Sequence, residues 1–196
     1  MEECSQFPSM TILEHGESVH EWFMDLYNHL IHNCELQKCW RLPNWIYSPL
    51  IPKNLLPLNI LQTYHTYHDI GKPYCRVVDE KGKQHFPKHE EISFRIWMDN
   101  FVWAEDIPCE EKSINKTIGH LILNDMKAHT IKGENIQEFF DENLNCAMSL
   151  ILTALAEVHS NAAHLKQLDS TNFKIKIKQI DKLGKKFLRK DGNDND

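Results

Sequence analysis

Apolar residues recur at spacings of three and four through most of this chain, and that periodicity restricts it to a mainly helical fold. In residues 17–33, Val19, Trp22, Phe23 and Leu26 fall on one face of a helix. The same spacing predicts further helices over residues 59–69, 89–101, 108–126 and 143–165. The sequence therefore predicts an all-α fold.

Two internal segments interrupt this pattern. Residues 41–58 contain four prolines, which forbid a regular helix, but also apolar residues such as Trp45 and Ile46, which are unsuited to a solvated linker. We expect an ordered loop there that packs on the domain and could overhang a site. Residues 74–88 contain Val77 and Val78 followed by a turn with Gly82, and they predict a loop or a short hairpin.

The C-terminal region has a different composition. Apolar and basic residues alternate over 172–178, which predicts a strand, and residues 191–196 have the composition of a disordered segment. We therefore expect one domain over residues 1–168 and a short extension, the basic tail, over 169–196.

Charge is unevenly distributed along the chain. Residues 166–196 carry nine Lys or Arg and five Asp, a net charge of +4. Because the whole chain has a net charge of −6, the rest of the chain has a net charge of −10. The net negative charge of residues 1–165 does not attract polyanions. Binding of a phosphate substrate would therefore depend on local cations such as Lys72, Arg76 and Lys88. The basic tail is expected to add only a non-specific contact with nucleic acid.

The cysteines and the N-terminal residues bear on the compartment. Six cysteines are present with no CxxC pair, as expected for reduced thiols. The first residues lack the features of a signal peptide, and no apolar run is long enough to cross a bilayer. We expect a cytoplasmic protein with no membrane partner, and the sequence leaves its oligomeric state open.

The most informative motif is the run His-Asp-Ile-Gly-Lys-Pro at residues 68–73. It joins two metal-ligand side chains to a basic group that could bind phosphate. Further candidate ligands lie on both sides of it: His15, His85, His89, Asp125, His129 and His159. Imidazoles and carboxylates together suit Mn, Fe, Co, Ni or Zn, and such metals lower the pKa of water enough to generate hydroxide. The pattern predicts a metal centre assembled from several helices.

This arrangement resembles the HD-domain phosphohydrolase superfamily, and most closely the HD domain attached to bacterial tRNA nucleotidyltransferases. There the run HDIGKP is followed by a short acidic turn with glycine and then by H-F-x-x-H-E. In this chain the corresponding segments are residues 68–73, 78–82 and 85–90, and the resemblance extends in outline over residues 11–165. It implies a helical bundle of the HD type.

The resemblance also implies roles for individual residues. His15, His68 and Asp69 would bind a first metal, and His89 would bind a second that Asp69 bridges. Lys72 would contact the substrate phosphate or pair with Asp69, so that Asp69 and Lys72 are the candidate catalytic residues. One or two divalent ions are implied, of Mn, Fe, Co, Ni, Mg or Zn. From the residues alone, His20 competes with His15 for its role, and His85 competes with His89.

The C-terminal half departs from the family pattern at two positions. Residues 121–126 resemble the family's L-x-x-x-H-M run with Asp125 in place of His, and residues 155–162 resemble its L-A-x-A-D-x-x-A run with His159 in place of Asp. If both alignments hold, His and Asp have exchanged places and both are ligands. If either is displaced by a few positions, the remaining candidates are Asp169, Glu157 and His129.

The resemblance implies a metal-dependent phosphohydrolase, either a phosphatase or a phosphodiesterase. Its substrate would be a nucleotide, or a terminal or 2′,3′-cyclic phosphate of RNA. The alternative is a non-catalytic HD-like module that keeps a structural metal and holds a protein or nucleic-acid partner through the proline-rich loop and the basic tail.

Overall fold

A computed structural model describes residues 1–7, 9–105, 107–131 and 133–193, with the backbone alone for 191–193. Helices dominate these residues, so the all-α prediction is confirmed. None of the described helices combines the length and the apolar character needed to cross a bilayer. The chain divides into two compact units, unit 1 over Met1–Ser18 and Pro57–Met126 and unit 2 over Val19–Leu56 and Lys127–Asp196.

Unit 1 begins with a small antiparallel pair, β1 (Ser5–Phe7) and β2 (Met10–Thr11), which leads directly into helix α1 (Ile12–His32). A capping box fixes the start of α1. The backbone N–H of Thr11 donates to the Glu14 carboxylate at 2.7 Å, and the N–H of Glu14 donates to the Thr11 hydroxyl at 3.2 Å. The first turn of α1 is therefore well defined.

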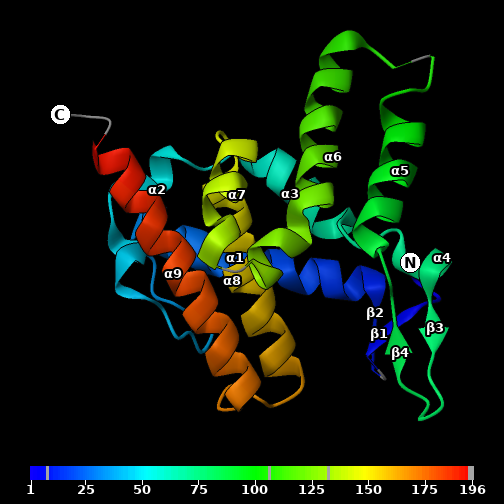
Figure 1. Ribbon diagram of the computed structural model, residues 1–196, viewed down its shortest axis with the longest axis horizontal. Helices are drawn as coiled ribbons and strands as arrows, with labels where there is room; N and C mark the ends of the chain where they lie inside the picture. The colour runs from blue at the N-terminus through cyan, green and yellow to red at the C-terminus, as the bar shows by residue number, and fades with distance from the viewer. Residues whose placement is uncertain (8, 106, 132, 194–196) are drawn as a thin grey trace. The chain divides into compact units, whose positions relative to one another are not determined.

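The middle of unit 1 follows the expected order (Figure 1). Helix α3 (Leu58–Tyr67) is followed by the short helix α4 (Lys72–Cys75), and then by the hairpin of β3 (Val77–Val78) and β4 (Gln84–His85). Gly82 has a φ of 76°, which suits its place in the hairpin turn. The predicted short hairpin is confirmed.

Two long helices complete unit 1. Helix α5 (His89–Phe101) begins at the predicted residue, and α6 (Cys109–Thr130) begins after Pro108. The indole N–H of Trp97 in α5 donates to the backbone carbonyl of Asn115 in α6 at 2.9 Å. Gly119 permits close packing there, because a Cβ at this position would lie 2.9 Å from the sulfur of Met98.

In unit 2 the proline-rich segment is ordered, as predicted. It forms the 3₁₀ helix η1 (Asn44–Tyr47) and the short helix α2 (Leu50–Lys53), and it buries Trp45, Ile46 and Ile51. The backbone N–H of Leu56 donates to the Ser149 hydroxyl at 3.0 Å. Unit 2 also contains the 3₁₀ helix η2 (Gly133–Asn135), α7 (Ile136–Glu142) and α8 (Ala147–His164), and α8 is buried along almost its whole length.

The strand prediction for residues 172–178 is wrong. Residues of the expected tail form the helix α9 (Thr171–Asn193), which lies beside α8 (Figure 1). Its buried side chains, Phe173, Ile180, Leu183 and Phe187, recur at helical spacing. The segment therefore belongs to unit 2, which continues across the predicted domain boundary at residue 168. Of the segment predicted to be disordered, residues 194–196 lie outside the described residues.

Candidate metal centre

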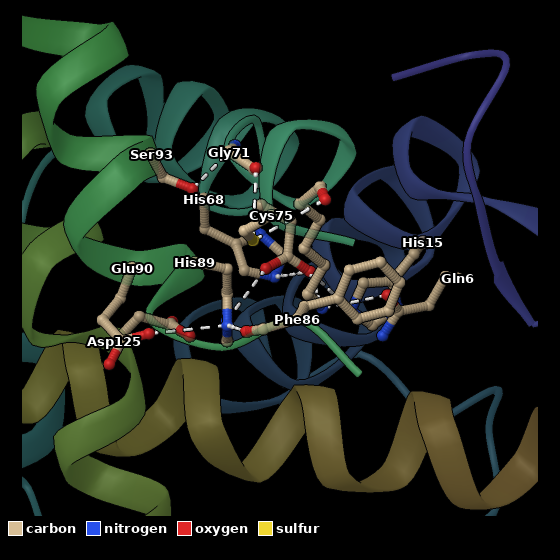
Figure 2. A network of polar contacts seen from close by, with 12 residues as sticks. Gln6, His15, His68, Gly71, Cys75, Phe86, His89, Glu90, Ser93 and Asp125 are labelled. Atoms are coloured by element: carbon tan, nitrogen blue, oxygen red, sulfur yellow. Dashed lines mark hydrogen bonds and ion pairs between the residues drawn. The ribbon is translucent and has the colours of Figure 1, made fainter. Parts of the chain in front are cut away.

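Three histidines of unit 1 lie around the buried carboxylate of Asp69. Figure 2 shows the side chains of these histidines, His15, His68 and His89. Nε2 of His68 lies 3.2 Å from Oδ2 of Asp69, and Nε2 of His15 lies 3.7 Å from the same oxygen. Nε2 of His89 lies 3.4 Å from Oδ1. The described residues thus contain histidines and carboxylates that could hold a metal ion, and His15 and His68 are among them.

Each of the three histidines occupies the end of a helix. His15 lies in the capped first turn of α1, His68 is the C-cap of α3, and His89 is the first residue of α5. Lys88, which precedes α5, has a left-handed conformation with φ of 56°. Helix ends are where the chain changes direction, so side chains from three helices can reach one carboxylate.

Two glycines allow these elements to approach closely. A Cβ on Gly16, next to His15, would lie 2.6 Å from the backbone oxygen of His65 in α3. A Cβ on Gly71 would lie 2.4 Å from the backbone nitrogen of Ser93 in α5, and Gly71 also donates its N–H to the Ser93 hydroxyl at 2.9 Å. Any larger residue at either position would force the histidine-bearing elements apart.

Backbone carbonyls fix the protonation of two of the rings. Nδ1 of His68 donates to the carbonyl oxygen of His65 at 2.8 Å, and Nδ1 of His89 donates to that of Phe86 at 2.9 Å. Nε2 of each ring therefore points toward Asp69. An imidazole lone pair and a carboxylate oxygen repel each other, so this arrangement requires either a second proton on each ring or a shared cation. Carbonyl-oriented histidines of this kind are common among metal ligands.

Lys72 lies against the same carboxylate. Its Nζ is 2.5 Å from Oδ2 of Asp69, donates to Oε1 of Gln6 at 2.9 Å, and lies over the ring of Phe86. Lys72 is buried although it is a lysine, which is tolerated because its charge is paired. Lys72 was expected either to contact the substrate phosphate or to pair with Asp69, and the structure contains the pair with Asp69.

The charge of Asp69 follows from these neighbours. Burial alone raises the pKa of its carboxyl group, but the positive charges of His68, Lys72 and His15 together with the hydrogen bond from His68 outweigh burial and lower that pKa strongly. Asp69 is therefore ionised, as a metal ligand must be.

Asp125 is buried on α6 and accepts a hydrogen bond from the hydroxyl of Tyr64 in α3. Tyr64 is itself fully buried, and its ring lies 6.2 Å from that of His68. Asp125 thus belongs to the polar surroundings of the centre, and its carboxylate is held by α3. Nothing in the sequence indicated the pairing with Tyr64.

His159 is not placed as a metal ligand, and this part of the prediction is wrong. In unit 2 its Nδ1 donates to the carbonyl oxygen of Leu155 at 2.7 Å, and its Nε2 accepts the backbone N–H of Arg41 at 3.0 Å. The rings of Trp22, Trp40 and Phe173 pack around it. Burial lowers the pKa of His159 to about 4, so the ring is neutral with both nitrogens occupied.

The remaining candidates make contacts of their own. His129 and Glu157 form an ion pair in unit 2, with Nε2 and Oε2 at 2.7 Å. Asp169 is exposed and pairs with Arg41. His85 pairs with Asp79 on the hairpin at 2.8 Å, so it is His89 that reaches Asp69. His20 is half-buried on α1, and burial lowers its pKa.

The other predicted phosphate-binding residues lie at the surface of unit 1. Arg76 is the exposed C-cap of α4, and exposed Lys88 lies 3.7 Å from the carboxylate of Glu91. Lys72 alone of the three contacts Asp69 in the part of the chain that the structure describes. Gln6, which holds Lys72, was not identified from the sequence, because the three-residue strand that carries it is too short to give a periodic pattern.

The chain matches no protein-family model, no curated protein and no solved structure. Assignment to a family therefore depends on the motifs at residues 68–73 and 85–90 and on the geometry around Asp69.

Proposed function

We propose that this chain is an HD-type, metal-dependent phosphohydrolase. Its proposed substrate is a nucleotide, or a terminal or 2′,3′-cyclic phosphate of RNA. The observation that carries the proposal is the convergence of His15, His68 and His89 on the ionised carboxylate of Asp69. The pair of His85 with Asp79, by contrast, involves one histidine and lies at the surface.

The donor set fits a particular class of metal. Three imidazoles and one carboxylate suit Mn, Fe, Co, Ni or Zn, whereas Mg prefers a set of oxygen ligands and is therefore a weaker candidate. His15, His68, His89 and Asp69 would hold one or two such ions. A divalent ion supplies Lewis acidity and lowers the pKa of water toward neutrality, which is the chemistry that phosphate ester hydrolysis needs.

The protein's own groups would have distinct tasks. The carbonyls of His65 and Phe86 orient two imidazoles so that their Nε2 atoms face the centre. Lys72 offers a cation that can contact a phosphoryl oxygen while Gln6 and Asp69 hold its ammonium group. Burial of Asp69 keeps water from competing for its oxygens.

The test is metal content followed by a substrate panel. Protein purified without chelator should contain Mn, Fe, Co, Ni or Zn, and after chelation and reloading with Mn or Co it should release phosphate, or open a 2′,3′-cyclic phosphate, on at least one nucleotide or RNA end. His68→Ala should lose both metal and activity. His85→Ala, which removes the exposed histidine of the Asp79 pair, is the matched control and should retain both. Metal-free protein, or activity that survives His68→Ala, would refute the proposal.

A second candidate is a non-catalytic module with the same metal centre. One observation favours it. Both ring nitrogens of His159 form hydrogen bonds with backbone groups, so the last position of the family pattern contributes no ligand. Stoichiometric metal without hydrolysis of any member of the panel would support this candidate over the hydrolase.

A further inference from the structure

Helix α9 concentrates its positive charge on one side. At 3.6 residues per turn, five basic residues fall within an arc of about 80° that extends for about 22 Å along the helix. We call these residues the basic stripe: Lys174, Lys178, Lys182, Lys185 and Arg189, all exposed.

The stripe lies opposite the apolar side of α9. Phe173, Ile180, Leu183 and Phe187 are buried and hold the helix in unit 2. The positions of the five cations are therefore fixed by a folded helix. An alternating strand, which the sequence suggested for residues 172–178, would have directed its lysines to one face over a much shorter distance.

Most of the charge of the stripe is uncompensated. Lys185 pairs with Asp181 at 2.6 Å, whereas Lys174, Lys178, Lys182 and Arg189 have no ion-pair partner within the described residues. Like charges at spacings of three and four destabilise a helix, so the fold itself gains nothing from this arrangement. A polyanion placed along the stripe would relieve the repulsion.

A groove of about 430 Å³ runs beside the stripe in unit 2. Its walls include Lys174, Lys178, Asp181 and Lys185 from α9, Arg41 from the segment before η1, and Asn44, the first residue of η1. The guanidinium of Arg41 lies 5.9 Å from the ring of Phe173. The groove thus presents four cations and one carboxylate, together with amide and apolar surface, and this excess of positive charge suits a sugar-phosphate chain.

We infer that the basic stripe and its groove bind the phosphate backbone of a nucleic acid. An anionic lipid surface is a poorer partner, because membrane-bound amphipathic helices insert their apolar face and that face of α9 is buried in unit 2. The inference concerns binding alone, and it does not depend on the proposed hydrolase activity.

The salt dependence of RNA binding tests the inference without any substitution. A fluorescently labelled RNA of about twenty nucleotides should bind the full chain with a slope of log K against log salt of about −3, as expected for four or five phosphate contacts on a single strand. A duplex of the same sequence should give a slope of about −4. A slope near zero, or tighter binding to phosphatidylserine vesicles than to RNA, would overturn the inference.

A triple substitution locates the contacts. Lys174→Gln, Lys178→Gln and Lys182→Gln together retain good helix formers and should flatten the single-strand slope by about 2, which weakens binding roughly a hundredfold at 0.1 M salt. Lys53→Gln, Lys81→Gln and Lys116→Gln remove the same charge from exposed positions elsewhere and should change binding by less than about threefold. Equal losses in the two triple variants, with unchanged circular dichroism, would mean that net charge alone is responsible. If the first variant unfolds, Lys185→Gln with Arg189→Gln provides the same test.

Discussion

The two units of this chain each bury histidine side chains, and they do so in opposite ways. In unit 1, His68 and His89 use Nδ1 on backbone carbonyls and direct Nε2 toward a carboxylate. In unit 2, His159 uses both nitrogens on backbone groups and is surrounded by aromatic rings. The difference teaches that burial does not distinguish a candidate metal ligand from a core residue, whereas the partner of the second ring nitrogen does.

The strongest test of this contrast is Asp69→Asn. Loss of the carboxylate charge should leave three imidazoles without their common partner, so bound metal should fall to background and hydrolysis should be abolished. Elemental analysis and phosphate release measure the two effects. Asp79→Asn removes the exposed carboxylate paired with His85 and should change neither. Retained metal in the Asp69 variant would mean that Asp69 is a structural acid like Asp79.

Lys72→Met should have the next largest effect. The substitution removes the cation next to Asp69 while conserving length, so metal should be retained and kcat/KM should fall by about 10- to 1000-fold. Lys83→Met, at an exposed position of the hairpin, serves as the control and should be indistinguishable from the native chain. Loss of metal with no separate kinetic defect would instead make Lys72 a structural partner of Asp69.

His159→Leu probes the other unit and should affect stability alone. Metal content should be unchanged, and the free energy of unfolding at pH 7 should fall by about 1–3 kcal/mol, because the N–H of Arg41 loses its acceptor. His32→Leu, an exposed histidine of α1, should change stability by less than about 0.5 kcal/mol. Metal loss in the His159 variant would contradict the distinction between the two units.

The pH dependence of unfolding sharpens the same point. The pKa of His159 is lowered to about 4 in the folded chain, whereas an unfolded histidine has its usual pKa of about 6.5. Between these values the unfolded chain binds more protons, so this residue contributes stability that is lost as the pH falls from 6.5 to 4. Denaturant unfolding over that range should show a shallower decline for His159→Leu than for the native chain. Parallel curves would indicate that His159 titrates normally.

The smallest expected effect is the coupling between Asp125 and His159. The double change Asp125→His with His159→Asp restores the order of the family pattern, and it would recover function if both residues were ligands. Because His159 is committed to Arg41 and Leu155, and Asp125 to Tyr64, we expect the two losses to add within about 0.5 kcal/mol. Recovery of activity or metal in the double variant would restore His159 to the centre.

The sequence predicted what is local in this molecule. Helical spacing located α5 and α6, and the motif at residues 68–73 identified His68, Asp69 and Lys72 as neighbours. The bond that removes His159 from the ligand set comes from Arg41, 118 positions away along the chain, and no local pattern reports it. The helix α9 was not predicted, because apolar and basic residues alternate over the seven residues 172–178, as in a strand. The helical spacing of its buried residues becomes evident only over the longer range from Phe173 to Phe187.

The close approaches at Gly16 and Gly71 have a consequence for genetics. Neither residue has a side chain that could take part in chemistry, yet a single methyl group at either position would collide with the backbone of a histidine-bearing element. If the chain is a hydrolase as proposed, a random screen for inactive alleles should recover alanine at Gly16 and Gly71 alongside changes in the proposed ligands. Alanine at Gly133, where a Cβ would meet only open space, should pass unnoticed.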